Sequence, residues 1–376
     1  MKFTLSWLKD HLDTSASVDE IADALTDLGL EVEEVVNPAS ALDAFRTARV
    51  IEAKPHPNAD RLRLCRVETF PDGPGGKPEE VQVVCGAPNA RTGMVGVFAP
   101  TGTHVPGTGV DLKPGVIRGE ASNGMLCSER EMMLSDDHEG IIDLPEDTPL
   151  GVRFVDWLAK HDPGKVDPVI EIAITPNRPD ALGVRGVARD LAARGLGTLK
   201  PYEVTPVAAA FDSPIGVHID ADTLAGCPLF TGRLIRGVKN GPSPAWLQAR
   251  LRAIGLRPIS ALVDITNFFT YDMNRPLHVF EADKVRGDLR IHWVAEPTEI
   301  EALDDKTYRV EPGMMGISDE AGLESVAGCV GGARTGVTGE TVNVFLESAY
   351  WDPVTIAATG RKLKLNSDAK YRFERG

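Results

Sequence analysis

Residues 256–280 read LRPISALVDITNFFTYDMNRPLHVF and place several polar groups among residues typical of a hydrophobic core. Thr266 and Asn267 are expected at the end of an apolar strand, although such a pair is also typical of the start of a turn. His278 follows Pro276, whose fixed backbone φ restricts the local turn. A histidine in this setting is either a packed core residue or part of a pocket lining, and the stretch alone leaves both alternatives open.

The composition limits the class of protein. With 376 residues the chain should hold two or three domains, and 42% hydrophobic with 25% charged residues is ordinary for a soluble globular protein. Charged residues come too early in MKFTLSWLKDHLD (1–13) for a signal peptide, and no run approaches the ~18 apolar residues of a membrane span. The formal net charge of −15 argues against non-specific coating by nucleic acid, so any polyanion partner requires a local basic patch.

The five cysteines are spread along the chain without a CxxC pair. That spacing is typical of reduced thiols in the cytosol, so a cytoplasmic location is expected. It also lacks a zinc signature, and we expect no metal site.

The first 40 residues predict a helix followed by a strand. Ser17 and Glu20 form a capping-box pattern ahead of apolar residues at helical spacing, and Gly29 is a typical helix stop. The following LEVEEVV (30–36) alternates as a strand does.

From about residue 45 to 150 the pattern changes to short strands and turns. VQVVCG (81–86) and VGVFAP (95–100) predict strands, and PDGPGGKP (71–78) predicts a long hairpin connection. Several short strands over about a hundred residues indicate a small barrel, for which an OB-fold is the natural size match. Helical patterns return at 182–197 and 243–255.

Several segments resemble, in the same order along the chain, the beta subunit of bacterial phenylalanyl-tRNA synthetase. They are MKFTLSWLKDHL (1–12), HPNADRLRLCRV (56–67), VCGAPNAR (84–91), RGEASNGMLCSE (118–129), LSDDHEGI (134–141), EIAITPNRPDALGVRGVARDLA (171–192), GLRPISALVDITNF (255–268), RPLHVFEADK (275–284) and SDAKYRFERG (367–376). The resemblance covers the chain from end to end. Members of that family continue well beyond FERG, so the chain is interpreted as an N-terminal fragment without the aminoacylation machinery.

The resemblance implies a multi-domain α+β protein. A first α/β module is expected to be split between residues 1–40 and 151–200, around an inserted OB-fold β-barrel of the tRNA-binding type at 41–150. A Pro- and Ala-rich linker at 201–214 leads to an α/β editing domain at 215–376, where the family hydrolyses mischarged tRNA.

Editing chemistry explains why such a domain needs a polar group in an apolar cleft. A pocket for phenylalanine rejects tyrosine by only roughly a hundredfold, because tyrosine merely adds a hydroxyl. A second site must therefore select for the hydroxyl, and a buried carboxylate suits because a charged acceptor strengthens a hydrogen bond from a phenol. By resemblance this acceptor is Glu347, which alternation places on the same strand face as Asn343 and Phe345. Periodicity alone also allows a solvated residue on an edge strand.

Four residues form the candidate catalytic set: His278, Glu347, Thr266 and Asn267. The resemblance implies that His278 orients the ester or a water as a neutral imidazole, rather than acting as an obligatory general base. A ribose hydroxyl of the terminal adenosine could assist the water equally well. Thr266 and Asn267 would contact the amino and carbonyl groups of the substrate.

Five further residues are expected to bind substrate: Arg257, Pro276, Gly328, Ser367 and Ala369. Arg257 would hold a phosphate or ribose of the acceptor end, although it could instead cap a helix C-terminus. Ala369 is small enough to leave room for the substrate ring.

The chain departs from the family pattern at three places. Ser367 stands where threonine is usual but keeps the hydroxyl, so we expect activity to survive. Lys370-Tyr371 stands where Ser-His is common, and GGAR (331–334) replaces the usual Gly-Gly-Glu. These two changes affect the expected loop contacts more than the pocket.

Charge distinguishes two surfaces that tRNA could contact. Residues 41–150 hold 11 basic and 17 acidic residues, with three phenylalanines as their only aromatics, so weak or negligible intrinsic tRNA affinity is expected there. Residues 361–376 hold six basic and two acidic residues, and Arg361, Lys362 and Lys364 are the candidate tRNA contacts. A solvated helix face would show the same pattern.

The expected partners are tRNA-Phe and the alpha subunit of the synthetase, as an α2β2 assembly of the full protein. No cofactor is expected within this chain, and ATP with magnesium is expected only in the full complex. A non-catalytic scaffold that places tRNA is an alternative function, and a free-standing tRNA-binding protein built round the OB module is a third.

Overall fold

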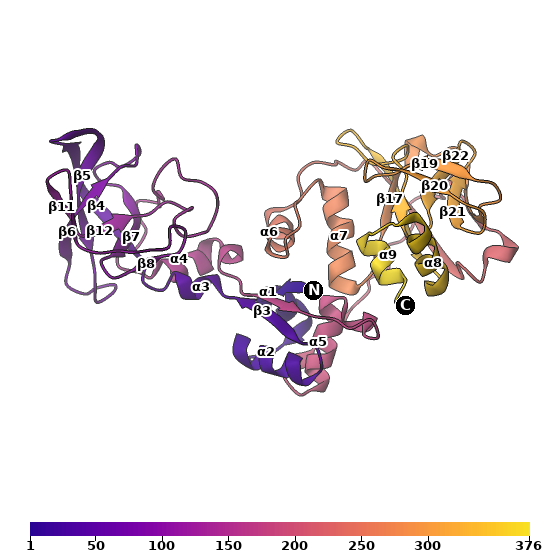
Figure 1. The fold of residues 1–376 in the computed structure, drawn as a ribbon, viewed down its shortest axis with the longest axis horizontal. Coiled ribbons are helices and arrows are strands. Elements are labelled where there is room, and N and C mark those ends of the chain that lie inside the picture. The colour runs from indigo at the N-terminus through magenta and orange to yellow at the C-terminus, as the bar shows by residue number, and fades with distance from the viewer. The chain divides into compact units, whose positions relative to one another are not determined.

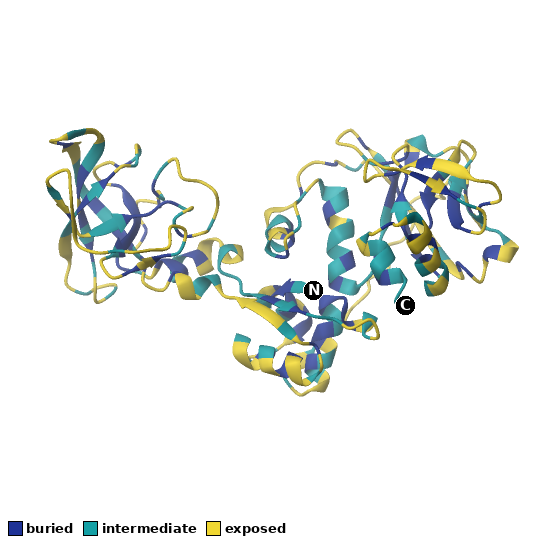
Figure 2. Ribbon diagram, in the orientation of Figure 1, coloured by how far each residue is buried: buried dark blue, intermediate teal, exposed yellow.

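The computed structural model describes residues 1–376 and divides the chain into two compact α+β units (Figure 1). Unit 1 comprises Met1–Val35 and Val169–Gly376, and unit 2 comprises Val36–Pro168. Figure 2 shows buried residues on both the strands and the helices, and exposed residues in most of the loops. No helix is both long and apolar enough to cross a membrane.

Unit 2 is built on one antiparallel five-stranded sheet with the strand order β12-β7-β4-β5-β6. Its strands are β4 (Arg46–His56), β5 (Ala59–Thr69), β6 (Glu79–Cys85), β7 (Val95–Pro100) and β12 (Gly124–Leu126). Residues 71–78 connect the hydrogen-bonded pair β5 and β6, which confirms the predicted hairpin connection. The amide of Asn123, just before β12, donates to the carbonyl of Gln82 on β6 at 2.9 Å, so the two outer strands of the sheet approach each other.

Short elements complete unit 2. They are α3 (Pro38–Ala41), β8 (His104–Val105), β9 (Val110–Asp111), β10 (Gly115–Ile117), β11 (Glu120–Ser122), α4 (Phe154–His161) and the 3-10 helix η1 (Pro163–Lys165). Phe154 and Leu158 of α4 are buried in one core cluster with Phe45 and Val95. Residues 151–168, which the sequence boundaries assigned to the first module, therefore fold with unit 2, because the apolar face of α4 has its partners there.

The N-terminal part of unit 1 packs three helices against a three-stranded sheet of order β1-β13-β3. These elements are β1 (Lys2–Thr4), α1 (Leu5–His11), α2 (Val18–Asp27), β3 (Val32–Val36), β13 (Val169–Ile172) and α5 (Val184–Ala193). The capping box of Ser17 and Glu20 at the start of α2 is confirmed. The strands β2 (Leu12–Asp13) and β14 (Thr198–Leu199) pair beside them, and the 3-10 helix η2 (Pro179–Ala181) precedes α5.

Two helices of the later sequence also bury their apolar faces in this part of unit 1. Leu247 and Leu251 of α6 (Ala245–Ala253) belong to the same core cluster as Trp7. Phe268 of α7 (Ala261–Met273) stacks on Trp7 with ring centroids 5.2 Å apart. This shared core explains why the first module and the C-terminal region form one unit.

The C-terminal region of unit 1 contains two larger sheets. One has the order β16-β24-β17 and the other β15-β18-β21-β22-β23. Their strands are β15 (Val217–Ile219), β16 (Leu229–Arg236), β17 (His278–Glu281), β18 (Leu289–Trp293), β21 (Met315–Asp319), β22 (Gly322–Val326), β23 (Val330–Gly331) and β24 (Asn343–Tyr350). A hairpin of β19 (Thr298–Glu301) and β20 (Thr307–Val310) lies beside them.

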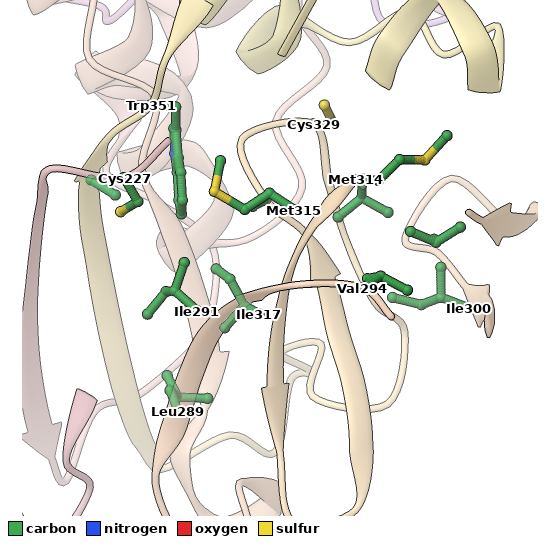
Figure 3. Packing of buried hydrophobic residues seen from close by; sticks show 14 of the residues in the cluster. Cys227, Leu289, Ile291, Val294, Ile300, Met314, Met315, Ile317, Cys329 and Trp351 are labelled. Atoms are coloured by element: carbon green, nitrogen blue, oxygen red, sulfur yellow. The ribbon is translucent and has the colours of Figure 1, made fainter. Parts of the chain in front are cut away.

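The core of this region gathers residues from both sheets, and Figure 3 shows Trp351, Met315, Ile291 and Ile317 in it. The helices α8 (Pro353–Leu363) and α9 (Asp368–Phe373) follow β24, and the 3-10 helices η3 (Ala221–Thr223) and η4 (Ala282–Lys284) lie between strands. Residues 201–214 are exposed and have no helix or strand.

The strand expected at Thr266 and Asn267 is wrong, because both residues lie inside helix α7. The sequence here is rich in Val, Ile, Thr and Phe, which favour strands. Phe268, Tyr271 and Asp272 recur at helical spacing, and the partners of Phe268 and Asp272 lie in the first module. Tertiary packing therefore outweighs the local preference.

Candidate active site

His278 and Glu347 stand directly opposite each other on neighbouring strands. In the antiparallel ladder between β17 and β24, His278 pairs with Glu347 and Phe280 pairs with Phe345. Side chains of directly opposed residues lie on the same face of a sheet, with Cβ atoms about 5 Å apart. The strand register thus brings the two polar candidates together within an apolar face.

Both side chains end in buried atoms that make no hydrogen bond. Glu347 is only 6% exposed and lies on the central strand of its sheet, so the alternative of a solvated edge residue is wrong. His278 Nε2 and Glu347 Oε2 are both inaccessible to solvent and without a partner. A buried polar atom without a hydrogen bond costs about 1–3 kcal/mol, and such atoms are rare in folded proteins.

Burial also sets the charge of the pair. It raises the pKa of Glu347 to about 8 and lowers the pKa of His278 to about 4, in each case by removing water from the charged form. At neutral pH both groups are therefore mainly uncharged. The expected neutral imidazole agrees with this state, whereas the expected charged carboxylate does not, because no cation offsets the loss of solvent around Glu347.

The His278 ring is held from two sides. It meets the Phe280 ring edge-on, with centroids 4.3 Å apart. On the other side it lies over the backbone of Gly331 in β23, where an added Cβ would come within 2.3 Å of the imidazole Cε1. Gly331 is thus required to leave room for the histidine ring.

The hairpin turn between β22 and β23 connects this pair to the C-terminal helices. Gly328 in the turn has a φ of +66°, and an added Cβ would meet Ile356 and Trp351 at under 3 Å. The next residue, Cys329, accepts a 2.6 Å hydrogen bond at its carbonyl from the Ser367 hydroxyl. Ser367 Oγ also accepts from the Lys370 amide and so caps α9.

Helix α9 is fixed against the end of α7. The Tyr271 hydroxyl donates to Asp368 at 3.0 Å, and the Arg372 guanidinium lies 4.7 Å from the centre of the Tyr271 ring. Ala369, which follows Asp368, is half-buried. Arg275, two residues after α7, donates to the Ala349 carbonyl on β24 at 3.0 Å. The C-terminal end of α7 therefore touches both α9 and the strand that carries Glu347.

Comparisons with known proteins agree with this arrangement. Residues 226–376 match the B3/4 domain model, and residues 45–153 match the model of a putative tRNA binding domain. The phenylalanine–tRNA ligase beta subunit of Cereibacter sphaeroides is 70% identical over 377 residues, covering 100% of this chain and 46% of its own. The corresponding subunit of Ruegeria pomeroyi is 67% identical over 376 residues, with the same coverage.

The chain is similar over its whole length to phenylalanine–tRNA ligase beta subunits. It spans about half the length of the curated relatives it matches. Among solved structures, an N-terminal fragment of the beta subunit from Pyrococcus horikoshii is 15% identical and covers 51% of this chain and 60% of its own, with a TM-score of 0.30. That value is too low to bear on the fold.

None of the remaining candidate residues lies on β17 or β24, the two strands that carry the pair. Thr266 donates its hydroxyl to the Val263 carbonyl within α7, and Asn267 is half-buried on the same helix. Pro276 is buried between α7 and β17, whereas Arg257 is exposed in the connection between α6 and α7. No hydrogen bond or ion pair joins Arg257 to His278 Nε2 or Glu347 Oε2.

The basic residues near the C-terminus fall into two groups. Arg361, Lys362 and Lys364 are exposed at the end of α8 and form no ion pair. The other three make internal contacts: Lys370 and Arg375 pair with Glu374, and Arg372 is buried and donates to the Leu182 carbonyl. Only half of the predicted basic strip is therefore free to meet an anion.

Two departures from the family pattern, GGAR (331–334) and Lys370-Tyr371, make contacts with other residues of the chain. Arg334 of the GGAR segment donates to the buried Glu324 at 2.6 Å and also pairs with Asp319. Arg375 lies 3.5 Å from the centre of the Tyr371 ring. These contacts stabilise the segments that carry Gly331 and Ser367.

Sequence reasoning missed two neighbours of the pair. No local sequence signal reveals the contact of Gly331 with His278, because that contact depends on the pairing of β22 with β23. Cys227 lies in the core close to Glu347: burial, and then the nearby Glu347 carboxyl, raises the pKa of its thiol to about 12. No group of three or more His, Cys, Asp or Glu residues is arranged to hold a metal ion.

Proposed function

We propose that this chain carries the editing site of a phenylalanine–tRNA ligase beta subunit and hydrolyses tyrosine from mischarged tRNA-Phe. The observation that carries the proposal is the opposed pair of His278 and Glu347, with unpaired buried atoms on one apolar sheet face. A phenolic hydroxyl bound between apolar side chains would supply the hydrogen bond that Glu347 Oε2 lacks.

Glu347 would select the substrate. In its neutral form the carboxyl group can accept a hydrogen bond from the phenol or donate one to it. Phenylalanine has no hydroxyl and would leave Oε2 unpaired, at a cost of about 1–3 kcal/mol, or roughly 10- to 100-fold in rate.

His278 would orient the ester or the attacking water. Its low pKa keeps the imidazole uncharged near neutral pH, so Nε2 can accept or donate a hydrogen bond according to its tautomer. Thr266, Asn267, Pro276, Gly328, Ser367 and Ala369 would complete the cleft around the amino acid, with Arg257 towards the RNA. A ribose hydroxyl of the terminal adenosine remains an equal candidate for activating the water.

The test is deacylation of Tyr-tRNA-Phe by this chain and by two variants. Glu347→Gln should lose discrimination between Tyr-tRNA-Phe and Phe-tRNA-Phe by about tenfold or more, because the amide offers a different hydrogen-bonding pattern. His278→Ala should lower the rate constant for both esters. Hydrolysis that is unchanged in both variants would contradict an editing role.

In the complete synthetase we propose ATP- and magnesium-dependent charging of tRNA-Phe in a cytoplasmic α2β2 assembly with the alpha subunit, with no aminoacylation by this chain alone. We further propose that unit 2 is an OB-fold of the tRNA-binding type inserted into the first module. Its antiparallel sheet with approaching outer strands supports this assignment.

A non-catalytic scaffold is the second candidate function, supported by the extensive packing of α6, α7 and α9 on the first module. A scaffold would bind tRNA-Phe but release no amino acid from it. The deacylation assay therefore distinguishes the two functions.

A further inference from the structure

A long segment of this acidic protein contains no acidic residue. Residues 223–263 hold six basic residues and not one aspartate or glutamate, although the chain carries a formal net charge of −15. The six are Arg233, Arg236, Lys239, Arg250, Arg252 and Arg257. Such a segment keeps a positive potential unless acidic groups from elsewhere in the fold neutralise it.

The fold neutralises only one of the six. Arg250 forms an ion pair with Asp10 at 2.7 Å. Lys239, Arg252 and Arg257 are exposed and have no acidic partner, and the Arg252 guanidinium donates only to the Gln248 side chain at 2.7 Å. These three cations are therefore available to a ligand.

Hydrogen bonds hold the parts of the segment together at the start of α7. The Ala261 amide donates to the Gly241 carbonyl, and the Leu262 amide donates to the Asn240 side chain. The loop that carries Lys239 thus lies at the same helix end as the connection that carries Arg257.

An exposed aromatic ring lies on the neighbouring helix. Trp246 of α6 is 54% exposed, although one edge packs against Phe268 of α7, with centroids 5.6 Å apart. The Arg250 guanidinium lies 5.4 Å from the centre of the indole. Helix α6 thus carries an exposed aromatic ring and the free Arg252. Exposed aromatic rings and free cations together bind single-stranded nucleic acid, since phosphates meet the cations and a base stacks on the ring.

We propose that Lys239, Trp246, Arg252 and Arg257, here called the α6–α7 surface, form a binding surface for RNA. The three cations contact phosphates and the indole stacks on a base. The identity of that RNA as tRNA rests on the proposed function. The surface is separate along the chain from the exposed cations of α8, so it adds a second point of attachment.

The test measures the dissociation constant of uncharged tRNA-Phe for this chain over a series of salt concentrations. The triple variant Lys239→Glu, Arg252→Glu, Arg257→Glu should weaken binding about tenfold or more at low salt and reduce the slope of affinity against salt concentration. A matched control, Arg286→Glu, Lys306→Glu, Arg309→Glu, makes the same charge change at exposed residues elsewhere in unit 1 and should change affinity less than about threefold. Equal effects in the two triple variants, or no effect in either, would overturn the proposal.

Trp246 gives a second, spectroscopic test that leaves the surface charge intact. RNA should quench the tryptophan fluorescence of the wild type, and Trp246→Phe should remove most of that quenching while it keeps an aromatic ring against Phe268. Undiminished quenching in Trp246→Phe would overturn the stacking contact. Charge-dependent binding to phosphatidylserine vesicles without binding to RNA would overturn the choice of partner.

These measurements use uncharged tRNA and do not depend on hydrolysis. If the α6–α7 surface does not bind RNA, the deacylation assay still tests editing by the His278–Glu347 pair separately. Conversely, Glu347→Gln tests editing without altering the α6–α7 surface.

Discussion

At the scale of single residues, burial decides the chemistry of the candidate site. Glu347 and His278 face each other with one unpaired atom each, and no charged partner compensates either group for lost solvent. Both side chains are therefore mainly uncharged near neutral pH. The residue types could be chosen from the sequence, but their protonation states could not, because desolvation depends on what packs around them.

The raised pKa of Glu347 predicts a pH-dependent stability. Between about pH 4.5 and pH 8 the unfolded chain releases a proton that the folded chain keeps, so the free energy of unfolding of the wild type falls as pH rises through this range. Glu347→Gln should lack this loss, so the difference in unfolding free energy between wild type and variant should change by at most on the order of 5 kcal/mol across the range. Chemical denaturation across this pH range measures it, with the exposed Glu340→Gln as the control. A constant difference between wild type and Glu347→Gln would contradict the assignment.

Gly331→Ala should disturb His278 more than it disturbs the fold. The new Cβ would lie 2.3 Å from the imidazole Cε1, so the ring must move away from Gly331 and leave its position opposite Glu347. We expect Tyr-tRNA-Phe deacylation to fall about tenfold or more, with a stability cost of about 1–3 kcal/mol. Gly339→Ala, where an added Cβ meets nothing within 4 Å, is the control. Normal deacylation by Gly331→Ala would show that the ring position does not matter.

At the scale of elements, helix α7 links the candidate site to the first module. Figure 2 shows α7 as mostly half-buried, which agrees with its contacts on two sides. Phe268 and Asp272 meet Trp7 of α1, while Tyr271 meets Asp368 of α9. The composition of α7 favours a strand, so the prediction from the local sequence was wrong. The contacts that stabilise the helix come from residues distant in sequence.

Asp272→Ala should loosen this link. The Asp272 carboxylate accepts hydrogen bonds from Trp7 Nε1 at 2.8 Å and from His11, and all three side chains are buried. Its removal leaves two buried donors unpaired, so we expect a loss of about 2–4 kcal/mol in the free energy of unfolding. Asp23→Ala, at an exposed position on α2, should cost under about 0.5 kcal/mol. Equal midpoints of thermal unfolding for the two variants would contradict the structural role of Asp272.

At the scale of the whole molecule, free positive charge rather than domain type is expected to set where RNA binds. Unit 2 matches the model of a putative tRNA binding domain, yet residues 41–150 are net acidic and contain neither Trp nor Tyr. Unit 1 carries the exposed and unpaired Arg361, Lys362 and Lys364 at the end of α8.

Substituting these three residues by alanine should raise the concentration of Tyr-tRNA-Phe needed for half-maximal deacylation by about fivefold or more at low salt. The matched triple variant Arg61→Ala, Arg63→Ala, Arg118→Ala in unit 2 should change it by less than about twofold. Steady-state deacylation over a salt series measures both. A larger effect in unit 2 would mean that unit 2 brings in the tRNA.

The sequence by itself determined the family resemblance, the capping box of α2, the strands β6 and β7 of unit 2 and the charge distribution, because these depend on residue types at short, fixed spacings. Only the tertiary structure decided that His278 opposes Glu347, that residues 151–168 fold with unit 2, and that α7 is a helix. It also decided which cations remain unpaired. Strand register, burial and ion pairing depend on residues far apart along the chain, and periodicity within one segment carries no information about them.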